Sequence, residues 1–585
     1  MNVESLKKIA CQQIVHYHGY FEEQNVLVCD TETIKGKPYT IQFYNGLNTT
    51  LEYVNEHTIF DCYLDYVKSH FQKNLSMWFF YAPFDLPIIQ YPYKNFFTFE
   101  THTMGKGEFD FTYVTGKTWY GNHTMNGKQW VERDAFQYVF RGLEKIAKDL
   151  CLTLQKKPRP SFLGERAWRT EEEKKIFEDY AIVDVLVLWE LVYWILNIHR
   201  QFNVGLSVSL ADLAGKIFRK HFVSTPIHST QQEVTLAALS SYHGGKTQMY
   251  VKGPCILQNI FEYDITSAYP YAMSQIGNFF DYEIVRSKEI VNDGLYQVNA
   301  TIQCAYQPIF SETFERKKIL HKTWITGYEL NSCIRRSCLD YEVLDGYVME
   351  HGEKERNGLS EYVYQFFEKK QQAEKDNNIS ERLIDKLMMN ALYGKFISKI
   401  TEDTDIGEKW KGGVIFHPLI ATLITAYVRA YVHEIEHMCS SLHTSTDSVI
   451  TRMQDLTPLF PGVNGLGGLE KKHSGDALLV RPKVYVLFDK LDPSCYHKFD
   501  LGDDAKVFCI YCKAKVLKAA THGFYGSVQM LLNMWKGGQI NYVVNRMMRL
   551  KEAKRSRDPD ALAFVFRKQR RTLNVDWNQL SIWEE

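Results

Sequence analysis

Acidic residues follow two strand-like segments near the N-terminus, at spacings that suit the binding of divalent cations. Asp30 and Glu32 end the apolar run VLVCD as D-T-E-T, and the two-residue period of a strand places both carboxylates on one face with Thr31 on the other. Asp85 closes a second apolar run, WFFYAPFD. Carboxylate oxygens are the ligands that Mg²⁺ and Mn²⁺ prefer. A single aspartate at a strand end is more often a turn or capping residue, so the pattern depends on its other members.

A helical segment supplies those other members. Tyr180 and Asp184 are four residues apart, which stacks them on one helix face. Four acidic groups facing one cavity repel one another unless cations lie between them, as in a two-metal phosphodiesterase. The sequence therefore predicts a site with two Mg²⁺ or Mn²⁺ ions. One ion prepares a water for in-line attack, the other stabilises the leaving 3′ oxygen, and Tyr180 orients the water.

The order of these residues resembles the three-motif pattern of DnaQ-like proofreading exonucleases, which is D-x-E on a strand, then x-F-D, then Y-x-x-x-D on a helix. The resemblance implies that Thr33 and Phe84 contact DNA. The stretch KIAKD…LTLQK resembles the segment before the third motif in protein-primed DNA polymerases, which implies that Lys156 assists the chemistry. Tyr81 departs from the pattern, because those enzymes have at this position an asparagine that contacts the single-stranded 3′ end.

A second group of motifs begins with FEYDITSAYP, which resembles motif A of family B DNA polymerases with Ala268 in place of leucine. Taken alone, this segment is equally well a buried strand followed by a Tyr-Pro turn. As motif A, the strand delivers Asp264 to a metal, and the following turn offers backbone amides to a triphosphate. Tyr269 then fills the space that a 2′-hydroxyl needs, which selects deoxyribonucleotides by exclusion.

The segment KLMMNALYGK resembles motif B, and its spacing predicts a single helix face. The resemblance implies that this face binds the incoming nucleotide. Lys386 reaches the triphosphate, Tyr393 packs on the nascent base pair, and glycine leaves room for it. An upstream K-x-x-x-E offers Lys370 as a second phosphate ligand, for which Lys369 is the competing candidate. The matching residues of motif B are Lys386, Asn390, Tyr393 and Gly394.

The third palm motif, Y-x-D-T-D-S in the family, is represented by TSTDS. Ser445 replaces the first aspartate, and Asp447 retains the second, which in the family binds metal together with the motif A aspartate. Three shorter motifs imply further contacts with DNA. They are Lys483 and Tyr485 in K-x-Y, which grips the primer end, Tyr242, Gly244 and Gly245 in Y-x-G-G, and Arg429 in the template-contacting helix TAYVR.

In combination, the motifs resemble the protein-primed family B DNA polymerases of the phage phi-29 type. This resemblance implies a DNA-directed DNA polymerase with a 3′–5′ exonuclease that replicates a linear viral or plasmid genome. It implies two Mg²⁺ or Mn²⁺ ions per active site, primer-template DNA and dNTPs as partners, and a terminal protein as primer. A monomer in the host-cell cytoplasm, without a membrane, is expected.

The elements that position these residues follow from hydrophobic periodicity. Strands are expected at VLVCD, PYTIQFY and residues 260–264, and helices at 143–150, 171–198 and 418–438, with two more over 359–397 joined at Asp376. KEAKRSR and FRKQRR lie on helical patterns. The chain is too long for one hydrophobic core, and a break at 204–208 predicts a domain boundary.

The expected fold is α/β multidomain, an RNase H-like (DnaQ-like) exonuclease domain followed by a right-hand family B polymerase of palm, fingers and thumb. We predict the exonuclease domain at residues 1–205 and the polymerase at 206–585. Within the latter we assign the palm to about 206–276 and 418–512, an insertion of the terminal-protein-binding type to about 277–352, the fingers to about 353–397, a short second insertion to about 398–417 and the thumb to about 513–585.

Composition excludes few classes of function. There are 69 basic and 69 acidic residues, so any basic channel for nucleic acid must be local. No run of about 20 apolar residues and no signal peptide are expected, which predicts a soluble intracellular protein. The 12 cysteines show only one C-x-x-C, Cys509 to Cys512, within a strand-like alternation that points the two thiols to opposite faces. Zinc is therefore not expected.

Two rival functions remain open. A dedicated exonuclease with a degenerate, DNA-binding polymerase half explains Ser445 and is distinguished by primer extension with dNTPs and Mg²⁺. A non-catalytic replication scaffold explains neither the exonuclease carboxylates nor the motif B face.

Overall fold

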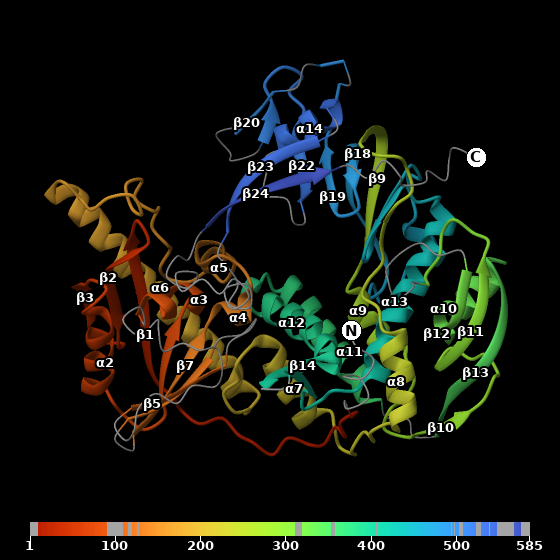
Figure 1. Ribbon diagram of the computed structural model, residues 1–585, viewed down its shortest axis with the longest axis horizontal. Helices are drawn as coiled ribbons and strands as arrows, with labels where there is room; N and C mark the ends of the chain where they lie inside the picture. The colour runs from red at the N-terminus through yellow and green to blue at the C-terminus, as the bar shows by residue number, and fades with distance from the viewer. Residues whose placement is uncertain are drawn as a thin grey trace.

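The computed structural model describes residues 10–89, 109–114, 120–125, 128–309, 319–352, 357–404, 407–492, 494–495, 498–501, 507–521, 528–537, 539–546 and 567–574. Figure 1 shows an N-terminal sheet with its helices at one end of the molecule and a sheet of later strands, β10 to β13, at the other. A central block of helices and a third sheet lie between them. The segment KEAKRSR, for which the sequence predicts a helix, lies outside the described residues.

The N-terminal sheet has seven strands in the order β3-β2-β1-β4-β7-β6-β5, with β1, β4 and β7 parallel. A tight turn at Lys35 and Gly36, both with positive φ, connects the first two strands. The strands are β1 (Asn25–Ile34), β2 (Lys37–Tyr44), β3 (Thr49–Tyr53), β4 (Leu75–Phe79), β5 (Phe109–Val114), β6 (Tyr120–Met125) and β7 (Lys128–Asp134).

Alternate residues of β1 pack against opposite layers of helices. Val26 and Val28 join the core formed with α6, while Leu27 and Cys29 join the core that surrounds α2 and α3. The face on which a β1 residue lies therefore decides which helix it meets. The helices are α2 (Ile59–Ser69), α3 (Ala82–Ile89), α4 (Phe136–Val139), α5 (Leu143–Asp149) and α6 (Glu171–Gln201).

Helix α6 begins at the capping residue Thr170, whose hydroxyl accepts a hydrogen bond from the Glu173 amide. By length and composition it could cross a membrane, so the expectation that the sequence has no such apolar segment is wrong. However, 56% of its apolar window is buried inside the protein and it carries Asp184. Both features are typical of a core helix.

Helices α7 (Leu210–His221) and α8 (Gln232–Ser241) lead from α6 into the third sheet. This sheet has the order β22-β19-β18-β9-β17-β16-β8, and its described pairs are antiparallel. Helix α13, predicted at 418–438, spans Pro418–Cys439 and packs against it. The other elements are β8 (Thr247–Met249), β9 (Cys255–Ile265), α9 (Ala268–Gln275), β16 (His443–Ser445), β17 (Ser448–Thr451), η3 (Thr457–Leu459), β18 (Leu469–Arg481), β19 (Val484–Phe488) and β22 (Val516–Thr521).

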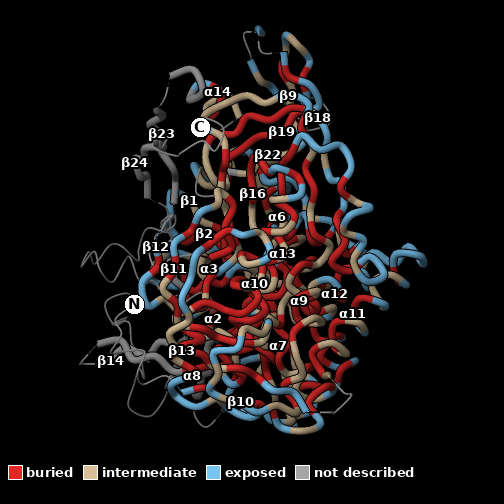
Figure 2. The backbone as a smooth tube through the Cα atoms, turned by 90° about the vertical axis from the view of Figure 1, so that its right-hand side faces the viewer, coloured by how far each residue is buried: buried red, intermediate tan, exposed pale blue. Residues whose placement is uncertain are grey.

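A separate four-stranded sheet, β10-β13-β11-β12, lies within the segment predicted as the first insertion. Helix α10 packs against α13, which joins this sheet to the central block. Figure 2 shows that buried residues run through α13, α10, α9 and α7, in the middle of the molecule. The elements are β10 (Tyr282–Arg286), β11 (Gly294–Ile302), β12 (Ile319–Thr326), α10 (Gly327–Arg335) and β13 (Leu339–His351).

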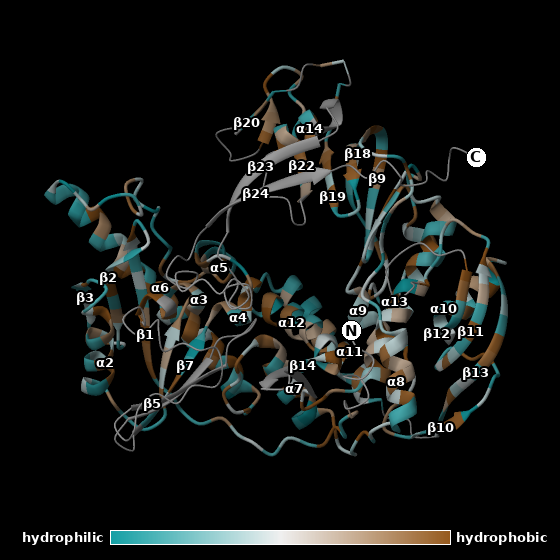
Figure 3. Cartoon of the chain, viewed as in Figure 1, coloured by the Kyte–Doolittle hydropathy of each residue, from teal (hydrophilic) through white to brown (hydrophobic). Residues whose placement is uncertain are grey.

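Two packed helices, α11 (Gly358–Lys375) and α12 (Ile379–Ala391), confirm the helical pair predicted between residues 359 and 397. Figure 3 shows α12 and α2 with both hydrophobic and hydrophilic residues, as helices on the border of a core have. Helix α12 ends before Tyr393, and a 3₁₀ helix, η2 (Tyr393–Ile397), follows. A two-stranded hairpin, β14 (Lys399–Thr404) and β15 (Gly407–Gly412), occupies the segment of the predicted second insertion.

Two expectations for the C-terminal part are wrong. FRKQRR is not helical, because its residues from Arg567 belong to β24 and pair with β23. Cys509 and Cys512 do not share a strand, because β21 ends at Cys509 and the chain turns back, with an Ala514 carbonyl accepting the Cys509 amide. The elements are β20 (Phe499–Leu501), β21 (Val507–Cys509), α14 (Val528–Gly537), β23 (Gln539–Arg546) and β24 (Arg567–Asn574).

Candidate active sites

The first site lies where β1 meets α6. Ligand oxygens of Asp30, Glu32 and Asp184 all lie within 4.8 Å of one another. The two β1 residues reach this point because they share a strand face with Val26 and Val28, which pack toward α6. Three of the four carboxylates expected at this site are therefore brought together.

The fourth, Asp85, lies on the other side of β1. Its Oδ1 accepts hydrogen bonds from the Thr31 amide (3.0 Å) and the Thr31 hydroxyl (2.8 Å). Helix α3 packs against the face that carries Thr31, so Asp85 approaches the site from that side and lies outside the group formed by the other three carboxylates. Oδ2 of Asp85 is buried without a hydrogen-bond partner in the described structure. Burial raises the pKa of Asp85 most, and the charge of Asp30 raises it further.

Without a cation, burial and mutual repulsion raise the pKa values of the carboxyl groups at the first site. Burial, followed by the charge of Asp184, raises the pKa of Asp30 to about 7, and burial raises the pKa of Glu32 well above its ordinary value. The Asp184 Oδ1 atom is buried without a hydrogen-bond partner in the described structure. A site for divalent cations explains both features, because bound cations would be partners for the buried oxygens and would stabilise their negative charge.

Lys156 and Tyr180 complete the first site. The Lys156 ammonium lies 2.5 Å from Asp184 Oδ2 and 5.2 Å from the centroid of the Tyr180 ring. Tyr180 is buried one helical turn before Asp184, as its spacing predicts. Lys156 is thus the cation nearest the carboxylates among the described ion pairs. Burial raises the pKa of Asp184, and the charge of Lys156 offsets part of that rise.

Tyr81 is held beside this site in an unusual backbone conformation, with φ of 68°. Its amide donates to Asp134 Oδ1 (2.8 Å), and its ring packs edge-on against Phe136. Sequence reasoning missed Asp134, which is buried and also accepts the Phe136 amide. Thr33 follows an irregularity in the β1–β2 pairing, and Phe84 packs on the core of α2 and α3.

The second site lies on the central sheet. Asp264 is near the end of β9 and Asp447 lies in the turn between β16 and β17, where Ser448 pairs with Asp264. The Ile265 amide donates to the Asp447 carbonyl (2.9 Å), which fixes the turn to β9. Burial, followed by the charge of Asp447, raises the pKa of Asp264 to about 7. The two carboxylates expected to bind metal are therefore neighbours.

A further carboxylate, Glu262, was not predicted. It lies two residues before Asp264 on β9, hence on the same face, and its side chain is fully buried. Glu262 Oε1 accepts hydrogen bonds from Lys518 Nζ (2.6 Å) and the Tyr485 hydroxyl (3.0 Å). The period of the strand was the signal that could have revealed it.

These contacts change the interpretation of Tyr485. Its side chain is buried, with 2% of its surface exposed, and its hydroxyl is bound to Glu262. The predicted contact of Tyr485 with a primer is therefore not available in this arrangement. Lys483 lies in the turn before β19 with φ of 65°, which places it at the tip of the β18–β19 hairpin.

Tyr269 and Tyr393 come together although a long stretch of sequence separates them. Their rings stack with centroids 4.2 Å apart and an interplanar angle of 3°. A Cβ atom on Gly245 would lie 2.7 Å from the Tyr269 hydroxyl and 2.5 Å from Thr446, so only glycine fits here. Nothing lies within 4 Å of a Cβ built on Gly244 or Gly394, which leaves open space beside the stack.

Basic side chains gather around Lys386. The pKa of Lys386 is lowered by burial and by the charges of Lys370, Arg141, Arg382 and Lys472. Such a set of positive charges fits a polyphosphate. Lys370, at 3.6 Å from Glu374, lies in this group.

Two details bear on the motif B prediction. Both lysine ammonium groups lie 5.4 Å from a phenylalanine ring, Lys369 over Phe202 and Lys370 over Phe367. The charge of Lys370 acts on Lys386, which places Lys370 nearer the predicted phosphate site. Because α12 ends at Ala391, Tyr393 and Gly394 do not continue the helix face of Lys386 and Asn390, whose amide donates to the Lys386 carbonyl (2.7 Å). They reach the same region through η2.

Arg429 has a different place from the one predicted. Its guanidinium is fully buried, forms an ion pair with Glu329 (2.8 Å) and donates to the carbonyls of His243 (2.5 Å) and Gly244 (3.2 Å). A buried guanidinium does not reach a template strand, so the predicted DNA contact is replaced by support of the loop that carries Tyr242. Glu329 comes from α10, which sequence patterns did not connect with α13.

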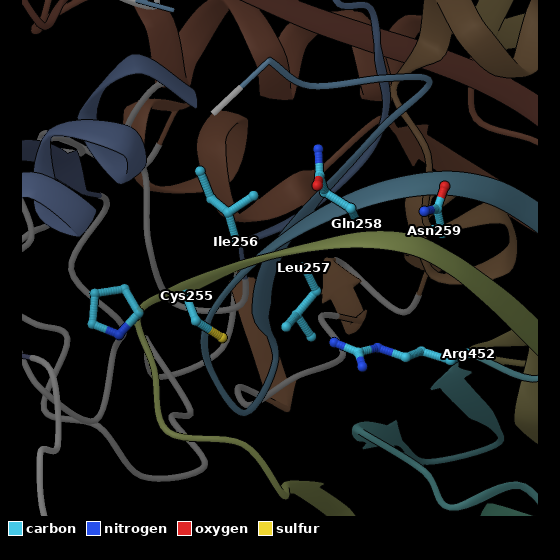
Figure 4. A pocket seen from close by; sticks show the side chains of 7 residues that line it. Cys255, Ile256, Leu257, Gln258, Asn259 and Arg452 are labelled. Atoms are coloured by element: carbon cyan, nitrogen blue, oxygen red, sulfur yellow. The ribbon is translucent and has the colours of Figure 1, made fainter. Parts of the chain in front are cut away.

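A pocket of about 750 Å³ opens along the first half of β9, away from Asp264. Figure 4 shows Leu257 and Arg452 on one side of the strand and Ile256 and Gln258 on the other. None of the predicted site residues lines it.

Comparison with protein families gives a match over residues 95–410 to type B DNA polymerases, organellar and viral. The DNA polymerase of Acidianus bottle-shaped virus is 25% identical over 279 residues, which are 44% of this chain and 40% of that protein. The DNA-directed DNA polymerase of Enterobacteria phage PRD1 is 22% identical over 370 residues, 55% of this chain and 62% of that protein. The matched regions thus span less than two thirds of these relatives.

Solved structures agree over nearly the whole chain. Phi29 DNA polymerase complexed with primer-template DNA superimposes with a TM-score of 0.67 at 14% identity, covering 94% of this chain and 100% of that one. The complex with primer-template DNA and incoming nucleotide substrates gives a TM-score of 0.64 at 15% identity, with the same coverage. At such low identity the likeness shows the fold, and it confirms the predicted class of an exonuclease-type domain followed by a right-hand polymerase.

Proposed function

The chain belongs to the organellar and viral type B DNA polymerases, and we propose that it is a DNA-directed DNA polymerase with an attached 3′–5′ proofreading exonuclease. The observation that carries this proposal is the presence of two carboxylate sites on two different sheets. Asp30, Glu32 and Asp184 meet at the first sheet, and Asp264 and Asp447 at the other. Tyr180 and Lys156 lie beside the first site, and Lys518 lies beside the second.

The second site fits template-directed extension of a primer. Two divalent cations, Mg²⁺ or Mn²⁺, supply Lewis-acid activation of the primer 3′-hydroxyl and charge neutralisation at the α-phosphate when bound by Asp264 and Asp447. Lys386 and Lys370 bind the phosphates of the dNTP. Lys518, the nearest described cation partner of Glu262, keeps the negative charge of the site in check.

The Tyr269–Tyr393 stack forms the floor for the incoming nucleotide. Gly245 lets the loop pass close to the Tyr269 hydroxyl, because a Cβ there would lie 2.7 Å from it. A ribose 2′-hydroxyl meets the Tyr269 ring, whereas deoxyribose does not. The open space at Gly394 accommodates the base pair.

The first site fits hydrolysis of a 3′-terminal nucleotide. Asp30, Glu32, Asp85 and Asp184 are the ligands for two divalent cations there, and the buried oxygens of Asp85 and Asp184 without partners support this assignment. Tyr180 orients the attacking water, and Lys156 holds Asp184 in place. Asp85 joins the others by turning its Oδ2 toward Asp30, the neighbour whose charge it feels most strongly. Thr33, Phe84 and Tyr81 hold the single-stranded end.

The same proposal extends to the biological setting. The chain acts as a monomer on primer-template DNA in the cytoplasm of a host cell, copies a linear viral or plasmid genome, and starts from a hydroxyl of a terminal protein bound at residues 277–352. The separate sheet β10-β13-β11-β12 in that segment supports an insertion with its own function. We propose the same domain limits as the sequence predicts, with the exonuclease at residues 1–205 and the polymerase at 206–585.

The alternative is an exonuclease with a degenerate polymerase half, which Ser445 favours. A primed template incubated with dNTPs and Mg²⁺ separates the two, with longer and shorter products resolved on one gel. Extension to the template end supports the polymerase. Shortening alone, at every dNTP concentration, supports the alternative.

A further inference from the structure

Two cysteines and two histidines from three distant parts of the sequence meet beside α13. The sulfur atoms of Cys304 and Cys338 and a ring nitrogen of each of His433 and His437 all lie within 4.8 Å of one another. Cys304 follows β11, Cys338 precedes β13, and the histidines are one turn apart on α13. The group is separate from both carboxylate sites.

The spacing of these atoms resembles a tetrahedral metal shell. Zinc bonds are about 2.3 Å to sulfur and 2.0–2.1 Å to nitrogen, which puts neighbouring ligand atoms about 3.3–3.8 Å apart in a tetrahedron. Cys338 Sγ lies 3.5 Å from His437 Nε2 and 3.9 Å from His433 Nε2. The two nitrogens are 2.9 Å apart, somewhat closer than in a filled shell.

Both ring nitrogens of His433 have contacts outside the group. Ser332 Oγ lies 2.7 Å from His433 Nδ1 and donates to Glu434 Oε1 (3.0 Å), so the serine oxygen can accept from Nδ1–H. His433 Nε2 faces the group and lies 3.2 Å from the Tyr306 carbonyl, a contact that a metal ion bound at Nε2 would replace. A histidine whose second nitrogen is hydrogen-bonded in this way is the usual metal-binding arrangement.

The donor atoms of this group are those that zinc prefers, two thiols and two imidazoles. Cys338 and His433 are buried, and Cys304 and His437 are partly buried. Thiol and imidazole donors at one partly buried point favour Zn²⁺ over harder cations such as Mg²⁺.

We propose that Cys304, Cys338, His433 and His437 bind a structural zinc ion. The ion joins the four-stranded sheet to α13, the helix that leads directly into β16 and Asp447. Its role is to hold the β10–β13 sheet on the central block, and its absence loosens that sheet without removing any group of either active site. The expectation from sequence that zinc is absent relied on paired C-x-x-C spacing, which long-range ligands do not have.

The test measures zinc by mass spectrometry in the full chain purified without added metal. Every chain carries Cys509→Ser, because Cys495, Cys509 and Cys512 form another group of thiols within 4.8 Å. We expect one zinc per chain, and its loss in Cys338→Ser and His437→Gln. Cys333→Ser, a buried cysteine on α10 outside the ligand set, keeps it. Equal zinc content in all four chains, or none in any, overturns the proposal.

A second measurement covers the case in which the ligand variants do not fold. The Cys509→Ser chain is stripped with a zinc chelator and titrated with Co²⁺, whose visible absorption reports tetrahedral coordination with sulfur ligands. We expect one equivalent of such Co²⁺, displaced by Zn²⁺, and faster proteolysis within residues 277–352 in the stripped chain. A stripped chain that binds no Co²⁺ and is cleaved at the original rate contradicts the proposal.

Discussion

The rings of Tyr269 and Tyr393 are 3° from parallel with centroids 4.2 Å apart, so one residue after β9 and one after α12 form a single aromatic surface. Gly245 passes close to the Tyr269 hydroxyl, where a Cβ would clash. The proposed gate against ribonucleotides therefore draws on three segments.

Tyr269→Val is expected to admit ribonucleotides more readily, because the smaller side chain frees the space beside C2′ while leaving Asp264 in place. We expect discrimination between dNTP and rNTP to fall at least about ten-fold, which corresponds to about 1.4 kcal/mol. The measurement is kcat/KM for each substrate. Tyr269→Phe keeps the ring and serves as the control. Unchanged selectivity in Tyr269→Val shows that another residue is the gate.

Ser445→Asp is expected to change the extension rate by less than about three-fold, since outer charges mainly adjust metal affinity. Glu262, Asp264 and Asp447 already supply negative charge here. The check is steady-state extension across Mg²⁺ and Mn²⁺ titrations, in which we expect a shifted metal optimum. If the wild type is inert and Ser445→Asp restores extension, the polymerase half is naturally disabled and the exonuclease alternative is correct.

The first site is expected to weaken the metal-free fold at high pH. The pKa of Asp30 is about 7 in the folded chain, against the ordinary value of 3.8 that applies when the chain is unfolded, so the folded chain binds more protons between these values. Stability without metal therefore falls as pH rises from about 4 to about 7 and stays low above. Asp30→Asn should raise the melting temperature in EDTA at pH 8 but not at pH 4.

The wild type gives the matched comparison for this prediction. Adding Mg²⁺ at pH 8 should raise its melting temperature more than that of Asp30→Asn, because the ion neutralises the same charge. Identical melting curves of the two chains in EDTA at pH 8 would falsify the view that ionised Asp30 destabilises the metal-free fold.

The short hairpin of β14 and β15 leads to a prediction about strand displacement. Its paired residues run only from Lys399–Gly412 to Thr404–Gly407, so the hairpin is short. We expect extension to slow or stop at a downstream duplex, while a single-stranded template is copied to the end. Gapped and fully single-stranded templates of equal length provide the comparison. Copying through several kilobases of duplex without a helper protein would contradict this interpretation.

Local patterns predicted much of the architecture. The strand period placed Asp30 and Glu32 on one face, and the helix period placed Tyr180 one turn before Asp184. These predictions succeed because they depend only on the backbone geometry of one element. The same rule, applied to β9, would have found Glu262.

Long-range packing set the limits of sequence reasoning. Asp85 binds Thr31 because α3 covers that face of β1, and Arg429 is buried because Glu329 arrives from α10. Neither partner is visible in the sequence near the motif. The Cys304 group is hidden for the same reason, since its members lie in separate segments.

The central claim is that two independent sites perform opposite reactions on one primer terminus, and one gel tests it. A labelled primed template is incubated with the wild type, with Asp30→Ala plus Glu32→Ala, and with Asp447→Asn, each with Mg²⁺ and with or without dNTPs. We expect the double variant to lose shortening but keep extension, and Asp447→Asn to lose extension by several orders of magnitude but keep shortening. Loss of both activities in either variant would contradict the two-site account.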